Sequence, residues 1–377
     1  MALIRCETYN EDAVYQAVKQ GIALLGGLSQ FVIKSEKIVL KPNVLLGSNP
    51  DTCVTTHPAV FKAAGRLMQE AGAVVYYGDS SSIGKCEGNC RRAGLKQAGD
   101  EMGFTIADFD SGRQVSHPDA LLVKSINIAN GVLDADGLVS LPKFKAHGLM
   151  RFTGAVKNQF GCIPGFIKGQ YHVKLADPYD FGRMLVDINT CIKLRLSIMD
   201  GIWAMEGNGP RNGKVRPMNV ILISADPVAL DATACRMINL APGAVPTNLA
   251  GEEAGLGTYH AENIELVGES LDSFYTPSFK VERRPPLHCS SNPVRSFLKN
   301  QVCEKPVISK AKCTVCGTCV QMCPVQPKAV DWHDGDKKKP PTYKYDRCIR
   351  CFCCQEVCPD GAISIKHPAL SKVLTSI

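Results

Sequence analysis

Eight cysteines in the C-terminal part of the chain form two regularly spaced runs. The runs are Cys313-x2-Cys316-x2-Cys319-x3-Cys323-Pro324 and Cys348-x2-Cys351-x2-Cys354-x3-Cys358-Pro359. Three thiolates on one tight loop can bind three irons of a cubane, while the fourth iron faces the returning chain, so this spacing is typical of [4Fe–4S] ligands. Zinc knuckles are the alternative, but a zinc site pairs Cys-x2-Cys units and needs no third evenly spaced cysteine. The pattern therefore predicts two [4Fe–4S] clusters.

Over about residues 303–368 these runs resemble the two-cluster bacterial ferredoxins, in which the fourth cysteine of each run ligates the other cluster. The resemblance implies one cluster on Cys313, Cys316, Cys319 and Cys358, and a second on Cys348, Cys351, Cys354 and Cys323. Cys353 departs from the pattern because it adds a thiol beside Cys354. It is either a spare or an exchange ligand, and the spacing favours Cys354.

Composition narrows the class of protein. With 377 residues and a hydrophobic fraction of 45%, the chain is long enough for two or three globular domains. The formal charge of +7 does not indicate a nucleic-acid partner, since each oxidised cluster with four thiolates contributes about −2. The basic run 337–339 is most simply solvated surface, and a docking patch for an acidic electron carrier is the alternative.

Cysteine usage and the N-terminal sequence predict a cytoplasmic location. Eighteen cysteines, eight of them in the cluster runs, favour a reducing and anaerobic cytoplasm where the other thiols stay reduced. We find no signal-peptide pattern and no run of about 20 apolar residues, so we expect no membrane insertion. Cys86 and Cys90 have no partner pair nearby and are interpreted as spare buried thiols. A third metal site with Cys53 or Cys162 is the alternative.

Strand and helix patterns alternate through the first 276 residues. Strands are predicted at 2–6, 37–40, 73–77, 105–109, 121–126, 137–141, 196–199, 220–223 and 264–267. Helices are predicted at 12–25, 58–71, 89–102, 149–160, 181–192, 227–238 and 244–254. This alternation indicates an α/β domain with a mainly parallel sheet. We expect that domain at 1–276, a linker at 277–300 and a small α+β ferredoxin-like domain at 301–377.

Polar, basic and glycine residues concentrate where the predicted strands end. In open α/β sheets ligands bind at the carboxyl ends of strands. The segments that follow these ends are Lys41-Pro42-Asn43, Gly78-Asp79-Ser80-Ser81, Pro142-Lys143-Phe144-Lys145-Ala146-His147 and Asp200-Gly201. A binding site is therefore expected at this edge.

The densest group of such residues runs from Lys143 to Lys174. In the predicted helix 149–160 the apolar residues Leu149, Phe152, Val156 and Phe160 form the buried stripe. His147, Arg151 and Asn158 then lie on the opposite face, with Lys157 between the two. A solvated face is the alternative, about as probable as function for Arg151. Gly161 and Pro164 end the helix, and the chain then brings Lys168 and His172. Together with the glycine turns, the basic residues of this group predict an anion pocket for a carboxylate or phosphate; they are Lys143, Lys145, Lys157, Lys168, His147 and His172.

Three other segments have features of helix caps or tight loops, and some of these features also suit ligand binding. Thr56-His57-Pro58 predicts a helix start, whose exposed N–H groups are also able to bind an anion. The loop Glu206-Gly207-Asn208-Gly209-Pro210 permits close backbone approach but matches neither the Walker nor the Rossmann pattern. Asp226-Pro227 is interpreted as a helix cap.

An ordered set of motifs resembles the domain of unknown function 362 family of iron–sulfur proteins, which usually carries a C-terminal two-cluster ferredoxin. The motifs are Lys41-Pro42-Asn43, Thr56-His57-Pro58, Gly78-Asp79-Ser80, Pro142-Lys143-Phe144-Lys145-x-His147, Val156-Lys157-Asn158-x2-Gly161, Met205-Glu206-Gly207-x-Gly209-Pro210 and Asp226-Pro227-x-Ala229-x-Asp231. The resemblance spans nearly the whole chain and implies architecture, while the family's reaction is unassigned.

From these positions we expect catalytic groups and a binding set. The expected catalytic residues are His147, Lys157, Asn158, Lys143 and Lys145. The expected cofactor-binding residues are Lys41, Asn43, His57, Asp79, Glu206, Gly207 and Gly209.

Three functions fit the sequence. The first is an oxidoreductase that passes low-potential electrons through two [4Fe–4S] clusters to an anionic small molecule or an unidentified second cofactor, with an electron donor or acceptor protein as partner. The second is a non-catalytic electron carrier or a metalloprotein assembly factor. The third is a hydrolase or isomerase in which the clusters are structural or sensory. The strand-end residues favour the first, although no flavin or nicotinamide fingerprint is evident.

Overall fold

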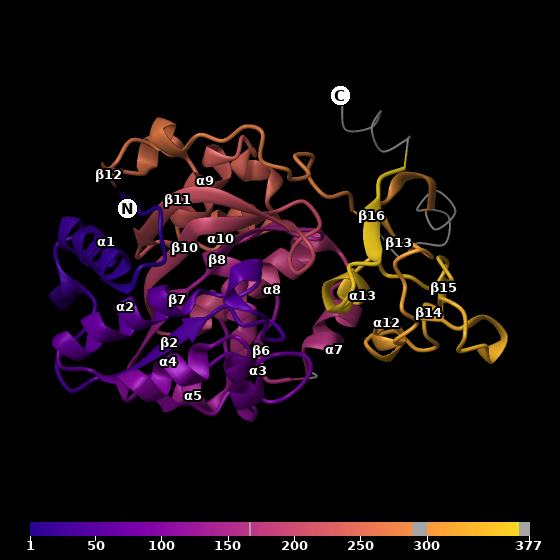
Figure 1. Ribbon diagram of the computed structural model, residues 1–377, viewed down its shortest axis with the longest axis horizontal. Coiled ribbons are helices and arrows are strands. Elements are labelled where there is room, and N and C mark those ends of the chain that lie inside the picture. Colours follow the sequence, from indigo (N-terminus) through magenta and orange to yellow (C-terminus); the bar gives the residue numbers. More distant parts are fainter. Residues whose placement is uncertain (166, 289–299, 369–377) are drawn as a thin grey trace.

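The computed structural model describes residues 1–165, 167–288 and 300–368, and it consists of two parts that lie side by side (Figure 1). The larger part is an α/β domain built on one ten-stranded sheet. The smaller part, drawn in orange to yellow, contains both cysteine runs and two short two-stranded sheets. Helices α13 (Cys353–Val357) and α7 (Ile167–Lys174) lie where the two parts meet.

The large sheet has the strand order β12-β1-β11-β10-β7-β2-β3-β4, with β8 attached to β10 and β9 to β8. Its strands are β1 (Ala2–Arg5), β2 (Lys37–Pro42), β3 (Val74–Tyr77), β4 (Thr105–Ile106), β7 (Gly137–Leu141), β8 (Lys143–His147), β9 (Arg151–Thr153), β10 (Leu194–Glu206), β11 (Lys214–Ser224) and β12 (Val267–Gly268). The run β10-β7-β2-β3-β4 is parallel throughout, whereas β11 is antiparallel to both its neighbours. A mainly parallel α/β sheet is therefore confirmed.

Helices follow most of the parallel strands. They are α1 (Glu11–Leu24), α2 (Pro58–Glu70), α3 (Cys86–Arg92), α4 (Leu95–Met102), α5 (Asn130–Leu133), α6 (Ala155–Asn158), α7, α8 (Pro178–Cys191), α9 (Pro227–Met237) and α10 (Pro246–Glu253). The predicted helix starts are confirmed at α2, where the His57 side chain accepts from Ala59 N, and at α9, where Asp226 accepts from Val228 N and Ala229 N.

Two predicted helices and several predicted strands were wrong in their extent. The strand expected at 264–267 overlaps β12 only at Val267, and the strand expected at 105–109 ends at Ile106. The helix expected at 149–160 is instead strand β9 followed by the four-residue α6. Its apolar stripe is buried as expected, because β9 and α6 both lie inside the fold. The helix expected at 89–102 is divided between α3 and α4 by Gly94, which has a φ of 72°. The strand expected at 121–126 begins four residues later, as β6 (Ser125–Ala129), which pairs with β5 (Gly112–Ser116).

The ferredoxin-like part is built from two similar halves. Strand β13 (Lys305–Ile308) pairs antiparallel with β16 (Ile363–Lys366), and β14 (Val330–Asp331) pairs with β15 (Thr342–Tyr343). One short helix follows each cysteine loop, α12 (Thr318–Gln321) in the first half and α13 in the second. The expected linker at 277–300 is described at 277–288 and at residue 300. Within it Phe279 is fully buried in the core of the α/β domain, while 289–299 and 369–377 lie outside the described residues.

The tip of the β10–β11 hairpin joins the two parts. Side-chain amides of Asn208 and Asn212 donate to the carbonyls of Ile363 and Cys358 over 3.0 Å each. Gln355 Nε2 donates in return to Asn208 Oδ1 over 2.9 Å. Side-chain amides thus connect the hairpin tip to the cysteine-bearing segment, and two of these three bonds end on backbone carbonyls.

Arg151 is a second connection between the two parts. Its guanidinium makes a bidentate ion pair with Glu304, at 2.9 and 2.8 Å, and is 1% exposed. The alternative of a solvated face for Arg151 was therefore wrong. The guanidinium neutralises a carboxylate at the domain interface, where an unpaired charge would be costly.

Candidate functional site

A cavity of about 550 Å³ lies between the strand ends of the α/β domain and the ferredoxin-like part. Its wall on the α/β side includes Asn43, Asp79, Ser80, Ser81, Lys157, Asn158, Phe160, Lys168 and His172. Its wall on the other side includes Met322, Cys323, Pro324, Cys353, Glu356 and Val357. A cavity of this size, apolar in part and with a few polar groups, is typical of a small-molecule site.

The order of the strands explains why distant polar residues meet here. Strands β7, β2 and β3 are adjacent and parallel, so their carboxyl ends lie at one edge of the sheet. Asn43 follows β2, Asp79 follows β3, and Lys143 follows β7. Asn43 and Asp79 therefore reach the cavity from neighbouring strand ends, whereas Lys143 does not line it.

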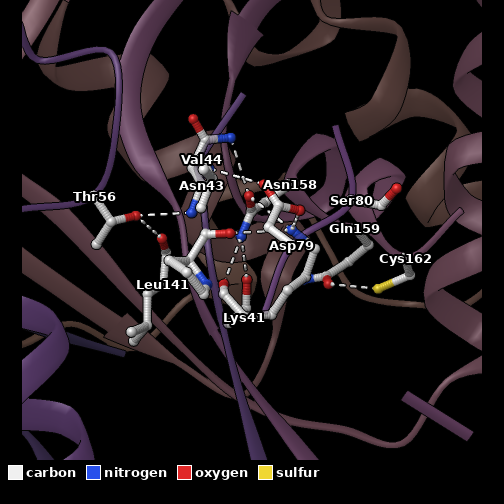
Figure 2. A network of polar contacts seen from close by, with 12 residues as sticks. Lys41, Asn43, Val44, Thr56, Asp79, Ser80, Leu141, Asn158, Gln159 and Cys162 are labelled. Atoms are coloured by element: carbon white, nitrogen blue, oxygen red, sulfur yellow. Dashed lines mark hydrogen bonds and ion pairs between the residues drawn. The ribbon is translucent and has the colours of Figure 1, made fainter. Parts of the chain in front are cut away.

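Figure 2 shows the polar network behind this wall. Lys41 Nζ makes an ion pair with Asp79 Oδ1 at 2.7 Å, and both side chains are almost fully buried. Asn158 Oδ1 accepts from Lys41 Nζ at 3.3 Å and from Asn43 Nδ2 at 3.1 Å, while Asn158 Nδ2 donates to Ser140 Oγ. Asp79 Oδ2 accepts from Val44 N at 2.8 Å. The polar atoms of Lys41, Asp79 and Asn158 all have hydrogen-bond partners. The three side chains therefore form one rigid frame.

Gly161 permits this frame to close. A Cβ atom at this position would lie 1.7 Å from Asp79 Oδ1 and 2.5 Å from Lys41 Nζ. The backbone of Gly161 also accepts from Ser80 N at 3.0 Å. This contact explains the last residue of the motif Val156-Lys157-Asn158-x2-Gly161. Only glycine leaves room for the buried ion pair at that position.

Strand β8 presents its polar residues on one face. Side chains alternate along a strand, so Lys143, Lys145 and His147 point one way, while Phe144 and Ala146 join the apolar core on the other. The sequence had suggested that these residues lead directly into a helix.

Lys143 belongs to a second closed network. Its Nζ lies 2.8 Å from Asp200 Oδ2 and donates to the hydroxyl of Tyr9 over 2.8 Å. The Tyr9 ring stacks on His57 with centroids 3.7 Å apart. Burial lowers the pKa of His57 to about 4, so its imidazole is neutral. This network does not line the cavity, and it holds the start of α2 against β10.

Lys145 lies directly beneath the cavity wall. Its Nζ donates to Asn43 Oδ1 over 2.6 Å and to the carbonyl of Val54 over 2.7 Å. Burial, followed by the charge of Lys157, lowers the pKa of Lys145 to about 7. Lys145 therefore orients the Asn43 amide, and it does so whether or not it is charged.

His147 contacts the ferredoxin-like part. Its Nδ1 accepts from the backbone N–H groups of Leu149 and Met150, at 3.0 and 3.2 Å. Nδ1 is therefore unprotonated, and Nε2 carries the proton toward Glu356 Oε1, 3.0 Å away. Burial lowers the pKa of His147 to about 4, which agrees with a neutral ring. His147 thus orients Glu356 and does not itself face the large cavity.

Glu356 was not anticipated from the sequence, where it is one residue between two cluster cysteines. It projects from α13 into the cavity wall. Burial opposes its ionisation, but His147 and Lys157 hold the pKa of the carboxyl at about 2. Only the docking of the two parts brings this charge to the strand-end site.

Lys157 is the cation that faces the cavity without a partner. Within the described ranges no hydrogen bond or ion pair satisfies its Nζ, in contrast to Lys41, Lys143 and Lys145. Burial lowers the pKa of Lys157, and the Glu356 carboxylate counteracts this effect. An ammonium held in this way attracts an anionic ligand.

Asp231 fixes the short helix that carries Lys157. Its two carboxylate oxygens accept from Ala155 N at 2.6 Å and Val156 N at 3.1 Å, which are the first two N–H groups of α6. A Cβ at Gly154 would lie 1.9 Å from Asp231 Oδ1, so the chain must be glycine there. Burial raises the pKa of Asp231 to about 7.

Lys168 and His172 enter from α7. Lys168 Nζ donates to the carbonyl of Ser80 over 2.7 Å, and burial lowers its pKa to about 7. The His172 ring stacks on Phe181 with centroids 4.5 Å apart, and burial lowers the pKa of His172 to about 4. Near neutral pH, Lys168 is thus the group at the cavity that is able to exchange a proton.

The remaining expected binding residues lie elsewhere. Glu206 accepts from Lys280 N over 2.9 Å at the end of β10. Gly207 and Gly209 lie in the hairpin tip that docks the ferredoxin-like part, and neither glycine nor Glu206 lines the large cavity. At Gly209 a Cβ would lie 2.0 Å from the carbonyl oxygen of Ala146, which explains the glycine by packing.

The structure sorts the eight cluster cysteines into two sets. One small cavity is lined by Cys313, Cys316, Cys319 and Cys358, and another by Cys323, Cys348, Cys351 and Cys354. Each set combines three cysteines of one run with the fourth of the other, so the donor sets fit two [4Fe–4S] clusters. Cys353 points elsewhere, since it lines the large cavity and not the second small one. Cys323 borders both.

The other cysteines are mostly buried thiols. The sulfur atoms of Cys86 and Cys90 lie 4.0 Å apart, and both side chains are buried. Neither belongs to a group of three ligand side chains close enough for a metal in the part of the chain that the structure describes. Cys303 is disulfide-bonded, so the expectation of uniformly reduced thiols was wrong at this position.

A family model for a domain of unknown function (DUF362) matches residues 38–236, and a 4Fe–4S dicluster domain model matches residues 305–359. The chain belongs to the DUF362 family and carries a C-terminal 4Fe–4S dicluster domain. It is 34% identical over 263 residues to the thylakoid-associated protein sll1697 of Synechocystis sp., a match that covers 70% of this chain and 81% of that protein.

Among solved structures, the lactate racemase apoprotein from Thermoanaerobacterium thermosaccharolyticum aligns with a TM-score of 0.42 and 13% identity. The alignment covers 63% of this chain and 56% of the racemase chain. A structural-genomics protein from Thermotoga maritima aligns with a TM-score of 0.37 and 15% identity, over 62% of this chain and 59% of that one. Across the described residues, none of the helices has the length and apolar character needed to span a bilayer.

Proposed function

We propose that this protein is an oxidoreductase that passes low-potential electrons through two [4Fe–4S] clusters to an anionic small molecule or a second cofactor held in the large cavity. The observation that supports it most is the shared wall: Cys323, in the second cysteine set, and Lys157, the unpaired cation, line the same cavity. A ligand attracted by Lys157 would thus lie against the residues that surround one cluster.

The two cysteine sets would hold one cluster each. When bound, such clusters supply single electrons at low potential. Cys316 is the exposed cysteine among the eight, while Cys323 borders the large cavity. Electrons would therefore enter or leave near Cys316, by way of a donor or acceptor protein, and reach the ligand near Cys323. The ferredoxin fusion keeps donor and site at high effective concentration.

The residues of the α/β domain would bind the ligand and move protons. Lys157 and Lys168 attract the anionic group, and Asn158 and Asn43 hold the wall in place through the Lys41–Asp79 frame. Lys168 Nζ, whose pKa is lowered to about 7, would supply or take a proton at neutral pH. His147 acts through Glu356 as a positioning residue. We further propose a cytoplasmic, anaerobic setting, since exposed low-potential clusters are oxidised by air.

The test begins with anaerobic purification and measurement of iron, sulfide and extractable flavin. Eight irons per chain and an EPR spectrum of two coupled [4Fe–4S] clusters are expected by counting two cubanes. The photoreduced protein is then mixed with small molecules extracted from the source cells, and cluster reoxidation is followed by stopped-flow absorbance. Reoxidation that is fast in the wild type and at least about tenfold slower in Lys157→Met supports the proposal. Equal rates in both proteins, or four irons with zinc, would refute it.

A further inference from the structure

The large cavity has charged and apolar walls, which together restrict the ligand it accepts. Lys157 and Lys168 are the cations of the inner wall, and Asp79 and Glu356 are its anions. Lys41, behind the wall, already offsets Asp79 at 2.7 Å. Glu356 offsets one of the two cavity lysines, so the inner wall carries a single net positive charge. Lys174, also at the cavity, is solvent-exposed and belongs to its rim.

A cluster held by the neighbouring cysteine set would make the electrostatic potential in the large cavity less positive. Cys323 borders both the large cavity and the second small one, so a cluster held there brings negative charge to the same wall. An oxidised cubane with four thiolates carries about −2. This charge repels a dianionic group about twice as strongly as a monoanion, and the single positive charge of the inner wall balances a monoanion but not a dianion.

Polar atoms without partners show where the head group would be held. Lys157 Nζ has no hydrogen bond or ion pair to any described residue. Ser81, also in the cavity wall, is 5% exposed, and its Oγ lacks a partner among the described residues. A buried hydroxyl without a partner is costly unless a ligand satisfies it. An ammonium and a hydroxyl donor together suit the two oxygens of a carboxylate.

The rest of the wall is apolar and comes from both parts of the molecule. Leu45, Leu46 and Phe160 line it from the α/β domain, and Met322, Pro324 and Val357 from the ferredoxin-like part. Val173, on α7 at the cavity, is 44% exposed and adds apolar surface to this wall. A ligand with an apolar body would cover these side chains, and an inorganic anion would not.

We propose that the cavity binds a monocarboxylate with an apolar body, such as an aryl or branched aliphatic acid, in preference to phosphate esters and nucleotides. This inference rests on the proposed function, in which the cavity holds an anion, and it names the chemical class of that anion. The carboxylate lies at Lys157 and Ser81, and the apolar body extends between α7 and α12.

Equilibrium binding to the intact, cluster-loaded protein tests the proposal. Three probes are titrated anaerobically by calorimetry at pH 6.5, where Lys168 is mostly protonated: phenylacetate, acetate, and phenyl phosphate, which carries the same ring mainly on a dianion. Phenylacetate is expected to bind at least about tenfold tighter than either of the others. Equal affinity for acetate, or tighter binding of phenyl phosphate, would overturn the inference while leaving an anion site intact. If none of the three binds, the anion site itself is wrong.

Variants locate the site. Lys157→Met is expected to weaken phenylacetate binding at least about tenfold, and Lys157→Arg to retain most of it. The matched control is Lys174→Met, at the rim, with less than about a twofold change. Unchanged binding in Lys157→Met would overturn the assignment of the carboxylate.

If that variant loses its cluster EPR signal, Val173→Asp serves instead, because it adds a negative charge at an exposed position. It should weaken phenylacetate binding about fivefold or more, and equal affinity would count against the cavity.

Discussion

Two groups of lysines meet at the strand ends of the α/β domain, and they differ in what faces them. Lys41 and Lys143 each contact a buried carboxylate, at 2.7 and 2.8 Å. Lys157 and Lys168 line the cavity without a carboxylate at ion-pair distance. The paired group belongs to the framework of the sheet edge, whereas the unpaired group is available to a ligand. The sequence presents all four as basic residues in one neighbourhood.

The presence or absence of a carboxylate partner distinguishes lysines that stabilise the fold from lysines that are available to bind a ligand. A buried ion pair loses several kcal/mol when one partner is removed, because the other charge stays in the interior. A cation that faces a cavity costs little stability when it is removed, but its loss abolishes the attraction for an anion. The same substitution should therefore have opposite consequences in the two groups.

The largest effect is expected for Lys41→Met, which leaves Asp79 buried without its partner. We expect a loss of about 3–5 kcal/mol in the free energy of unfolding, measured by urea denaturation followed by circular dichroism. Lys157→Met is the matched control and should change stability by less than about 1 kcal/mol. Similar losses in both variants would show that the two groups of lysines do not differ as described.

The next effect concerns the helix that carries the unpaired lysine. Asp231→Asn removes one of the two acceptors for Ala155 N and Val156 N. A loss of about 1–3 kcal/mol is expected, together with weaker anion binding because α6 is no longer fixed. Measuring both quantities separates this role from that of Lys41. Full retention of stability and affinity would mean that Asp231 does not hold α6.

The pH dependence of anion binding tests Lys168. Its pKa is lowered to about 7 by burial, so the ammonium loses its proton as the pH rises through neutrality. If only the charged form binds, affinity for phenylacetate should fall about tenfold from pH 6 to pH 8 and level off below pH 6. Glu356 and His172, with pKa values of about 2 and about 4, keep their charge states across this range.

Lys168→Arg supplies the control for this profile. Arginine stays protonated, so the affinity of that variant should be nearly constant between pH 6 and pH 8. Calorimetric titrations at several pH values in both proteins provide the comparison. A wild-type affinity that does not depend on pH would exclude Lys168 from the anion site.

The smallest effect on the clusters is expected for Cys353→Ser. Cys353 lines the large cavity, whereas Cys354 lines the small one with Cys323, Cys348 and Cys351. Iron content and the EPR spectrum of the reduced protein should therefore match the wild type in Cys353→Ser. Cys354→Ser should lose or alter one cluster. The reverse result would make Cys353 the ligand.

Much of the fold was predictable because it depends on local patterns. The alternation of strands and helices indicated the parallel sheet, and Pro58 and Asp226 indicated helix starts that the structure confirms. Short segments were less predictable. The apolar spacing of 149–160 fits a helix, but a strand and a single helical turn bury the same side chains equally well.

The candidate site was predictable only in part. Adjacent parallel strands brought Asn43 and Asp79 together as the strand-end argument expects, whereas Lys157 reaches the cavity from α6. Gly207 and Gly209 followed a predicted strand too, but the long β10–β11 hairpin carries them beyond the edge of the sheet to the ferredoxin-like part, and Glu206 accepts from Lys280 N instead. Strand order says which ends are adjacent and does not say how far a hairpin extends past them.

The sequence by itself determined the cysteine spacing, the α/β pattern and the gathering of basic residues, because each depends on residues close together along the chain. Tertiary structure decided which lysines are paired, placed Glu356 against His147, and put Cys353 on the cavity. Asp79 and Asp200, the partners of Lys41 and Lys143, come from other strands or strand ends of the same sheet, 38 and 57 residues away, whereas the other two outcomes depend on the docking of two parts that are far apart in sequence. Charge compensation is a property of distances in space, and spacing along the chain does not report them.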